Sequence, residues 1–123
     1  MKTLLTFSLF ISVTSFACPN LSGNYKHATL NRSQKVTQDA SKIQLGEGAL
    51  VMLIDGQSHD ISGQGGTLTY KVTCTDTKVT IDMKAVSNGT TLLGQSELTQ
   101  TANGYREVSK GFSEEDNTWI RLN

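Results

Sequence analysis

Three consecutive residues, Ser58, His59 and Asp60, have the side-chain types of a hydrolase triad, in which a histidine takes a proton from an attacking serine. The residues around them alternate between apolar and polar, which predicts a β-strand. Neighbouring side chains in a strand point to opposite faces, so Ser58 and Asp60 face away from His59. The three side chains therefore cannot transfer a proton from one to the next, and we expect the protein not to be an enzyme.

Metal and cofactor chemistry lacks the residue spacing that it requires. The two histidines, His27 and His59, lie far apart in the chain and have no other metal-ligating residue at ligand spacing. The glycine-rich segment Gly63–Gly66 precedes a predicted strand, whereas phosphate-binding loops precede a helix whose N-terminus holds the phosphate. We therefore expect no metal site and no cofactor.

Cys18 and Cys74 remain as candidates for covalent chemistry. In an oxidising compartment they can form a disulfide, which would stabilise the fold by about 4 kcal/mol on the chain-entropy model. The alternative is a lipidated Cys18, as in bacterial lipoproteins. Ser15 and Phe16 match such a signal poorly, because a leucine-like and a small residue are usual at those positions. We favour the disulfide and keep lipidation as the alternative.

Residues 1–17 have the features of a cleaved export signal. Lys2 supplies the positive charge, and the apolar stretch that ends at Phe16 is shorter than the roughly 20 residues that span a bilayer. Ser15 and Ala17 place small residues at the −3 and −1 positions of a cleavage site. Cleavage would leave residues 18–123 as a single domain. We expect an exported protein, periplasmic or secreted, without a transmembrane span.

The mature chain carries nearly equal numbers of acidic and basic residues, and the two signs are interspersed. Nucleic acids and anionic lipids bind to proteins that present a stripe of basic residues, and the sequence has none. Charge therefore points to no nucleic-acid partner.

Beyond residue 20 the hydrophobic pattern has a period of two, and turn residues recur every several positions, which is typical of antiparallel strands joined by hairpins. The clearest hairpin pairs Thr67–Thr73 with Lys78–Lys84. Asp55-Gly56 is typical of a two-residue type I′ turn and predicts a second hairpin around it, between Leu50–Ile54 and Gln57–Ile61. Further strands are predicted at Leu21–Leu30, Lys35–Gln38, Lys42–Leu45, Thr91–Leu98, Tyr105–Phe112 and Thr118–Leu122.

These segments predict an all-β fold, a single antiparallel up-and-down meander of about 8–10 short strands. A meander of this kind avoids exposed edges most simply by closing into a barrel. A sandwich of two sheets is the alternative.

The run from Cys18 to Tyr25, with Gly23 two residues before the aromatic residue, resembles the N-terminal entry of lipocalin-like, calycin-type barrels and of small secreted bacterial β-barrel proteins. The segment from Val36 to Gly56 is similar to their first half. The chain departs from lipocalins in having Tyr25 where tryptophan is usual. The resemblance implies a barrel that can hold a small apolar ligand, and it brings no catalytic residue.

Four large side chains on the expected interior face are the candidate ligand-binding residues: Tyr25, Met52, Tyr70 and Met83. Apolar walls with a few polar groups are typical of a ligand pocket, so we expect a non-enzymatic binding role, with a small apolar molecule inside the barrel. The alternative for the interior is a barrel filled by its own side chains. The alternative function is a monomeric module that binds or inhibits another exported protein through the loops around Gly63–Gly66 and Glu114–Asn117.

Overall fold

The computed structural model describes residues 18–63 and 65–123. The predicted signal peptide, residues 1–17, lies outside the described residues. Ten strands make up the regular structure of the described part, in agreement with the predicted all-β class: β1 (Gly23–His27), β2 (Ser33–Gln38), β3 (Lys42–Leu45), β4 (Val51–Leu53), β5 (Ser58–Gly63), β6 (Gly66–Cys74), β7 (Lys78–Ser87), β8 (Thr90–Thr101), β9 (Gly104–Lys110) and β10 (Glu115–Arg121).

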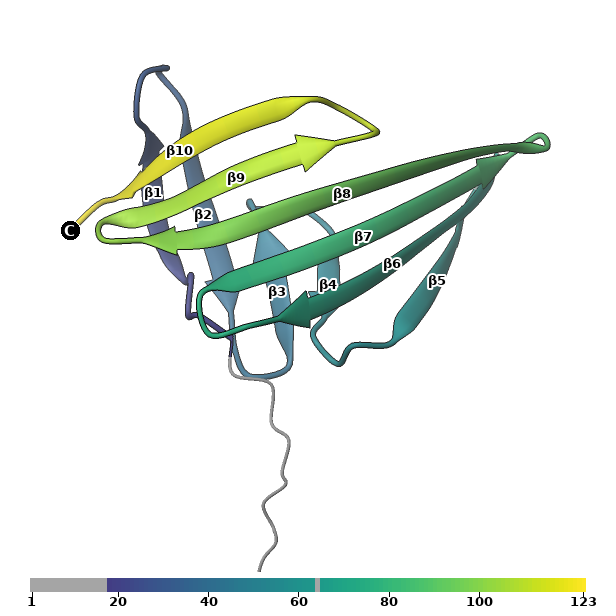
Figure 1. The fold of residues 1–123 in the computed structure, drawn as a ribbon, viewed down its shortest axis with the longest axis horizontal. Helices are drawn as coiled ribbons and strands as arrows, with labels where there is room; N and C mark the ends of the chain where they lie inside the picture. The colour runs from purple at the N-terminus through teal and green to yellow at the C-terminus, as the bar shows by residue number, and fades with distance from the viewer. Residues whose placement is uncertain (1–17, 64) are drawn as a thin grey trace, which may run out of the picture.

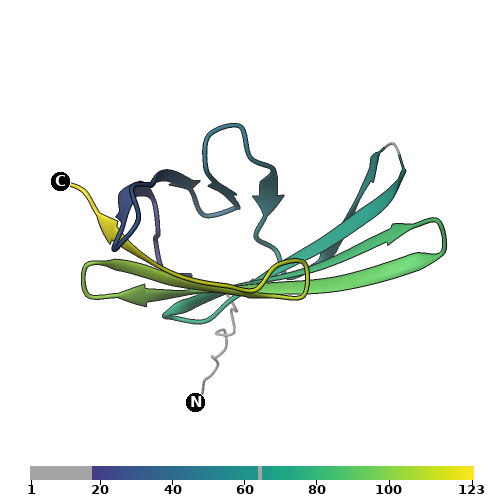
Figure 2. The same cartoon turned by 90° about the horizontal axis from the view of Figure 1, so that it is seen from above.

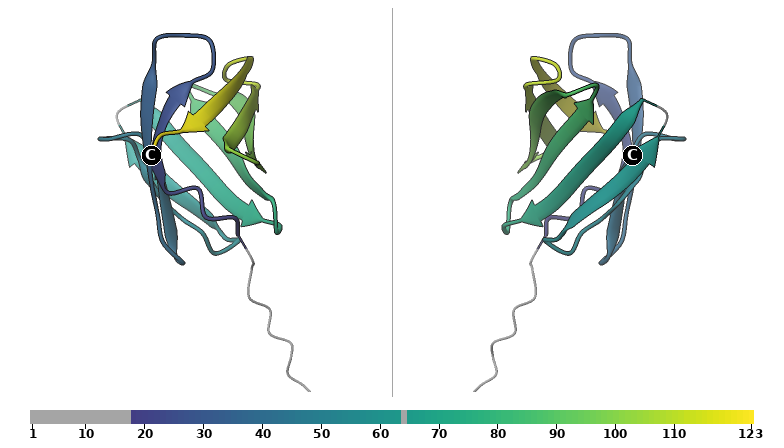
Figure 3. Two further views of the ribbon diagram at one scale, coloured as in Figure 1. Left: turned by 90° about the vertical axis from the view of Figure 1, so that its left-hand side faces the viewer. Right: turned by 90° about the vertical axis from the view of Figure 1, so that its right-hand side faces the viewer.

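All ten strands belong to one antiparallel sheet with the order β4-β3-β2-β1-β10-β9-β8-β7-β6-β5 (Figure 1). Strands adjacent in sequence pair with each other, except that β1 pairs with β10 and β4 does not pair with β5. The end views show the sheet curving round, so that β1–β4 lie across from β6–β8 (Figure 3). The meander is therefore confirmed.

The predicted closure into a barrel is wrong. β4 and β5 are consecutive in the chain but form the two opposite edges of the sheet. β4 packs against β6 instead of β5, and the backbone N–H of Leu53 donates to the hydroxyl of Tyr70 over 2.9 Å. This places β4 over the concave face of the sheet, so the two edges do not meet.

The predicted hairpin around Asp55-Gly56 is also wrong, because β4 and β5 do not pair. Gly56 has a φ of 72°, but Asp55 is not among the residues with positive φ, so the type I′ turn is not formed. The N–H of Gly56 donates to the carbonyl of Val72 over 3.1 Å, which ties the connection to β6. Asn88-Gly89, between β7 and β8, has positive φ at both residues, 50° and 77°. Asn88-Gly89 therefore has the positive φ angles that such a dipeptide adopts in a type I′ turn.

The predicted hairpin of Thr67–Thr73 with Lys78–Lys84 is confirmed as β6 and β7, which pair continuously from Thr67 with Val86 to Cys74 with Val79. Alternation assigns the faces correctly, since Tyr70, Val72 and Ile81 are buried on the concave side.

The core lies between the two halves of the curved sheet. Its buried side chains come from both halves, and Trp119, Tyr25 and Tyr105 are the largest that are almost fully buried. The disulfide between Cys18 and Cys74 is present, with a Cα–Cα distance of 5.0 Å, and packs against this core. It joins the N-terminal end of the described chain to the end of β6. Such a bond is consistent with an exported protein.

The strands differ in length, and this leaves part of the sheet without a facing layer. β7 and β8 have 10 and 12 residues, whereas β4 has three. β9 pairs with β8 only along Gln95–Thr101, so β8 continues beyond it. Figure 2 shows β5–β8 projecting past β1–β4. We call this part the distal end, formed by residues 61–63, 66–68, 85–87 and 90–93.

Among the residues that the structure describes, no helix has the length and apolar character needed to span a membrane.

Candidate functional site

The four predicted interior residues lie in or against the hydrophobic core, and they come from both halves of the sheet. Tyr25, Met52 and Tyr70 are buried, with 0, 3 and 4% of their surface exposed, and Met83 is half-buried. Tyr70 and Met83 are cross-strand neighbours on β6 and β7. Tyr25 lies on β1 in the opposite half of the sheet. The prediction placed all four on the interior side, but it did not foresee how they are separated.

Tyr25 is held by contacts that leave its hydroxyl fully engaged. The hydroxyl donates to the backbone carbonyl of Leu21 over 2.6 Å and accepts from Nη2 of Arg121 over 2.7 Å. Its ring meets that of Tyr105 edge to face, with ring centroids 4.8 Å apart. Burial raises the pKa of Tyr105 above its ordinary value. Both rings therefore act as packed core.

The residues of the rejected triad lie as predicted. His59 faces the concave side and stacks on Tyr70, with ring centroids 5.3 Å apart, while Ser58 and Asp60 are exposed. His59 has a partner that the sequence did not predict: Oδ2 of Asp55 lies 2.9 Å from its Nε2. The pKa of the Asp55 carboxyl is lowered, chiefly because the backbone N–H of Gln57 donates to it. The bend between β4 and β5 brings Asp55 and His59 together, and no local pattern signals that bend.

His27 is buried, and its ring nitrogens have fixed roles. Nδ1 accepts from the backbone N–H of Leu30 over 3.0 Å, so Nε2 carries the proton and donates to Oδ1 of Asn117 over 2.8 Å. Within residues 18–63 and 65–123, no three histidine, cysteine or acidic side chains gather as a metal site would require. The His27 contacts hold the β1–β2 connection to β10, which is a structural role.

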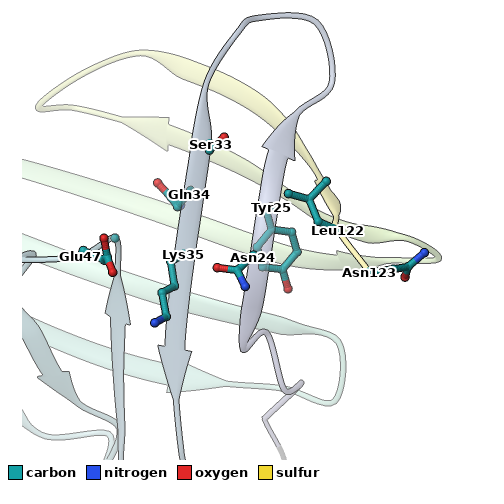
Figure 4. A pocket seen from close by; sticks show the side chains of 9 residues that line it. Asn24, Tyr25, Ser33, Gln34, Lys35, Glu47, Leu122 and Asn123 are labelled. Carbon is teal, nitrogen blue, oxygen red and sulfur yellow. The ribbon is translucent and has the colours of Figure 1, made fainter.

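A hollow of about 730 Å³ lies on the outer face of β1 and β2 (Figure 4). Asn24, Lys35 and Glu47 contribute polar side chains, and all three are exposed to solvent. Exposed polar groups are already hydrated, so a ligand there would gain little from replacing water. This groove is therefore a weak candidate for a binding site.

The concave face of the distal end carries a row of four apolar side chains, one from each of β5 to β8. The sheet register places Ile61 opposite Leu68, Leu68 opposite Ala85, and Ala85 opposite Leu92. We call this row the apolar ladder. Ile61, Leu68 and Ala85 are half-buried, and Leu92 is 58% exposed. The row continues the inner face of the core beyond the layer that covers it.

Three members of the ladder, Ile61, Leu68 and Ala85, line a shallow apolar hollow of about 300 Å³. Gly63, Gly65 and Gly66 also line it, so one of the two predicted contact loops borders this surface. The remaining lining residues are Thr67, Val86 and Ser87. The other predicted contact segment is mostly strand, because β10 begins at Glu115.

The opposite face of the same strands is mainly polar, although Val86 and Leu93 are exposed on it. The next row on the convex side contains Asp60, Thr69 and Lys84, and the Thr69 hydroxyl donates to the Asp60 carboxylate over 2.8 Å. Leu93 lies on this convex side and is 67% exposed. The distal end is thus one-sided, apolar on the concave face and mainly polar on the convex face, as in a sheet whose apolar face packs against something.

The ladder was not among the predicted site residues. Alternation could have placed its members on the inner face, but it could not show that this part of the face lacks a cover.

The chain matches no protein-family model, and searches of curated proteins and of solved structures found no match. The lipocalin-like resemblance stays a prediction.

Proposed function

We propose that this protein is a non-enzymatic binding module that takes up a segment of another exported polypeptide on the apolar ladder. The observation that carries this proposal is the row Ile61–Leu68–Ala85–Leu92, apolar across four strands and left without a facing layer at the distal end. Burial of a leucine or isoleucine side chain contributes about 1.5–3 kcal/mol, so a partner that covered the row would gain affinity from it.

A polypeptide fits this surface better than a small molecule does. Pockets for small ligands enclose most of the ligand surface, whereas the hollow on the ladder is shallow and Leu92 projects into solvent. The ladder extends across four strands and continues to the edge of the sheet at β5. A surface of this width and openness is typical of protein recognition.

A small apolar ligand inside the sheet, the first expectation from the sequence, receives less support. Tyr25, Met52 and Tyr70 are buried in the core, and the hydroxyls of both tyrosines are engaged. Ligand uptake between the two halves would require these side chains to move out of close packing, which costs free energy.

The test is selection of peptide ligands from a phage-displayed library of random dodecapeptides, with the protein recovered after export as the bait. Leu92→Lys places a charge on the apolar ladder, and Leu93→Lys places the same charge on the next residue, which faces the convex side. We expect selected peptides to bind the Leu92→Lys variant at least tenfold more weakly and the Leu93→Lys variant with unchanged affinity.

Two outcomes would overturn the proposal. One is equal affinity of the peptides for both variants, which would place their site away from the ladder. The other is that no peptide is enriched while the probe 1-anilinonaphthalene-8-sulfonate binds and is lost in the Leu92→Lys variant. That result would assign the ladder to a small apolar ligand.

A further inference from the structure

β5 forms one edge of the ten-stranded sheet, and β6 is its paired neighbour. The N–H of Thr75 donates to the carbonyl of Lys78 where β6 turns into β7, so by alternation the odd-numbered residues of β6 bond to β7 and the even-numbered ones bond to β5. The N–H of Gly56 donates to the carbonyl of Val72, in agreement with this alternation. The register pairs Tyr70 with His59 and Leu68 with Ile61, so His59 and Ile61 are the residues of β5 that bond to β6. The backbone N–H and C=O groups that point to the free edge belong to the alternate residues Ser58, Asp60 and Ser62.

The edge at β4 offers much less to a partner. β4 has three residues, and the Leu53 N–H, which points away from β3, is already bound by the Tyr70 hydroxyl. The edge at β5 has six residues, and across residues 18–63 and 65–123 no other strand pairs with it.

β5 also lacks the devices that usually protect an exposed edge. Edge strands avoid pairing with other chains through lysine or proline residues, through bulges or through very short length. The sequence of β5, Ser58–Gly63, contains no lysine, arginine or proline, and its register with β6 is continuous. Its one charged residue, Asp60, already accepts a hydrogen bond from Thr69.

We propose that an extended segment of the partner polypeptide adds to β5 as an eleventh, antiparallel strand, next to the apolar ladder. This inference rests on the proposed function, because the added strand anchors at the sheet edge the same polypeptide whose adjoining residues cover the apolar ladder. Unpaired backbone groups at alternate residues match the backbone of a β-strand, and antiparallel pairing continues the pattern of the whole sheet.

The position of the added strand fixes the chemistry of its side chains. Ile61 lies on the concave face and Asp60 and Ser62 on the convex face, so the added strand continues both faces. Side chains of the partner beside Ile61 extend the apolar ladder, and those beside Asp60 lie in solvent. The partner segment therefore alternates between apolar and polar residues and carries no acidic side chain opposite Asp60.

The probe is the peptide acetyl-Thr-Val-Thr-Val-Thr-Val-Thr-Lys-amide, labelled on its lysine for fluorescence anisotropy. With its valines on the concave face, the residues opposite Ser58, Asp60 and Ser62 are threonines, and in an antiparallel pair their amides donate to β5. Methylation of the amides of two central threonines should lower affinity at least tenfold. Methylation of two valine amides, which point away from β5, should leave affinity within about twofold and serves as the matched control.

The protein side of the test is Asp60→Pro, with Asp60→Ala as its control. Proline removes an N–H at the free edge but no bond to β6, so the strand can form while pairing is blocked. We expect Asp60→Pro to lose peptide binding at least tenfold and Asp60→Ala to retain it. The peptide-methylation comparison uses the unaltered protein and remains decisive if Asp60→Pro fails to fold.

The outcomes separate this inference from the proposed function. If Leu92→Lys weakens binding of the library-selected peptides but both methylated probe peptides bind like the parent probe, the ladder binds polypeptide and strand addition is wrong. If the valine-methylated peptide is the weak one, the added strand is parallel and the antiparallel assignment is wrong. If the purified protein sediments as a dimer and Asp60→Pro as a monomer, the edge is occupied by a second copy, and assignment to another polypeptide is overturned. If the parent peptide does not bind, the edge is not a binding site.

Discussion

The Tyr70 hydroxyl lies 2.9 Å from the backbone nitrogen of Leu53 and accepts a hydrogen bond from its N–H. This bond joins β4 to β6 across the concave face, where a closed barrel would instead pair β4 with β5. We expect Tyr70→Phe to lower the free energy of unfolding by about 1–2 kcal/mol, because the hydrogen bond is lost and a partly buried N–H is left without an acceptor.

The measurement for Tyr70→Phe is urea denaturation together with amide hydrogen exchange. The Leu53 amide should exchange faster in the variant. The Ile54 amide donates to the Ser41 carbonyl over 2.8 Å and should be unchanged, which makes it the internal control. Unchanged exchange at Leu53 would show that the bond does not hold β4 in place.

The Cys18–Cys74 disulfide closes a loop with a sequence separation of 56 residues. Replacement of both cysteines by alanine should lower the free energy of unfolding by about 2–4 kcal/mol, because the unfolded chain regains the freedom that the bond removes. Urea denaturation with and without a reductant measures this. The reductant should destabilise the parent protein and leave the double variant unaffected; an unaffected parent would contradict the prediction.

Gly104 packs against the backbone of β10, where an added Cβ would lie 1.8 Å from the carbonyl oxygen of Trp119. Gly104→Ala should therefore push β9 from β10 and cost about 3 kcal/mol, since backbone cannot rotate away as a side chain can. Gly63→Ala is the matched control, because no atom of the described residues, apart from Gly63 itself and its chain neighbours, lies within 4 Å of its Cβ position. Thermal denaturation of the two variants should separate them clearly, and similar melting temperatures would show that the close contact is absent.

Arg106 and Asp116 form an exposed ion pair between β9 and β10, with Nη2 and Oδ2 2.6 Å apart. Hydrogen bonds from Arg106 hold the pKa of Asp116 below its ordinary value of 3.8. Because the folded pKa is the lower one, the stabilisation by this pair is complete above pH 3.8 and is lost as the pH falls through the folded pKa.

NMR titration of the Asp116 carboxyl carbon checks this prediction. The midpoint should lie below 3.8 in the parent protein and move up toward that value in Arg106→Gln. Arg32→Gln, which alters an arginine next to Trp119, should leave the midpoint unchanged. Equal midpoints in the parent and Arg106→Gln would contradict the assigned cause.

The sequence by itself determined where the strands lie and which face of the sheet each side chain points to. The reason is that the period-two alternation of apolar and polar residues is a local pattern, present within each strand. It placed Tyr70 and Ile81 on the inner side and separated His59 from Ser58 and Asp60. The cysteine pair was also predictable, since a chain with two cysteines has one possible intramolecular disulfide.

Only the tertiary structure decided where the sheet ends. The Asp55-Gly56 dipeptide predicts a hairpin, but bonds from distant residues, Tyr70 and Val72, hold the chain on either side of it and keep β4 from β5. Likewise, alternation shows that Leu92 faces inward but not that it is exposed. Exposure of Leu92 depends on the lengths of strands in the other half of the sheet, because a side chain is buried only where a facing layer reaches it.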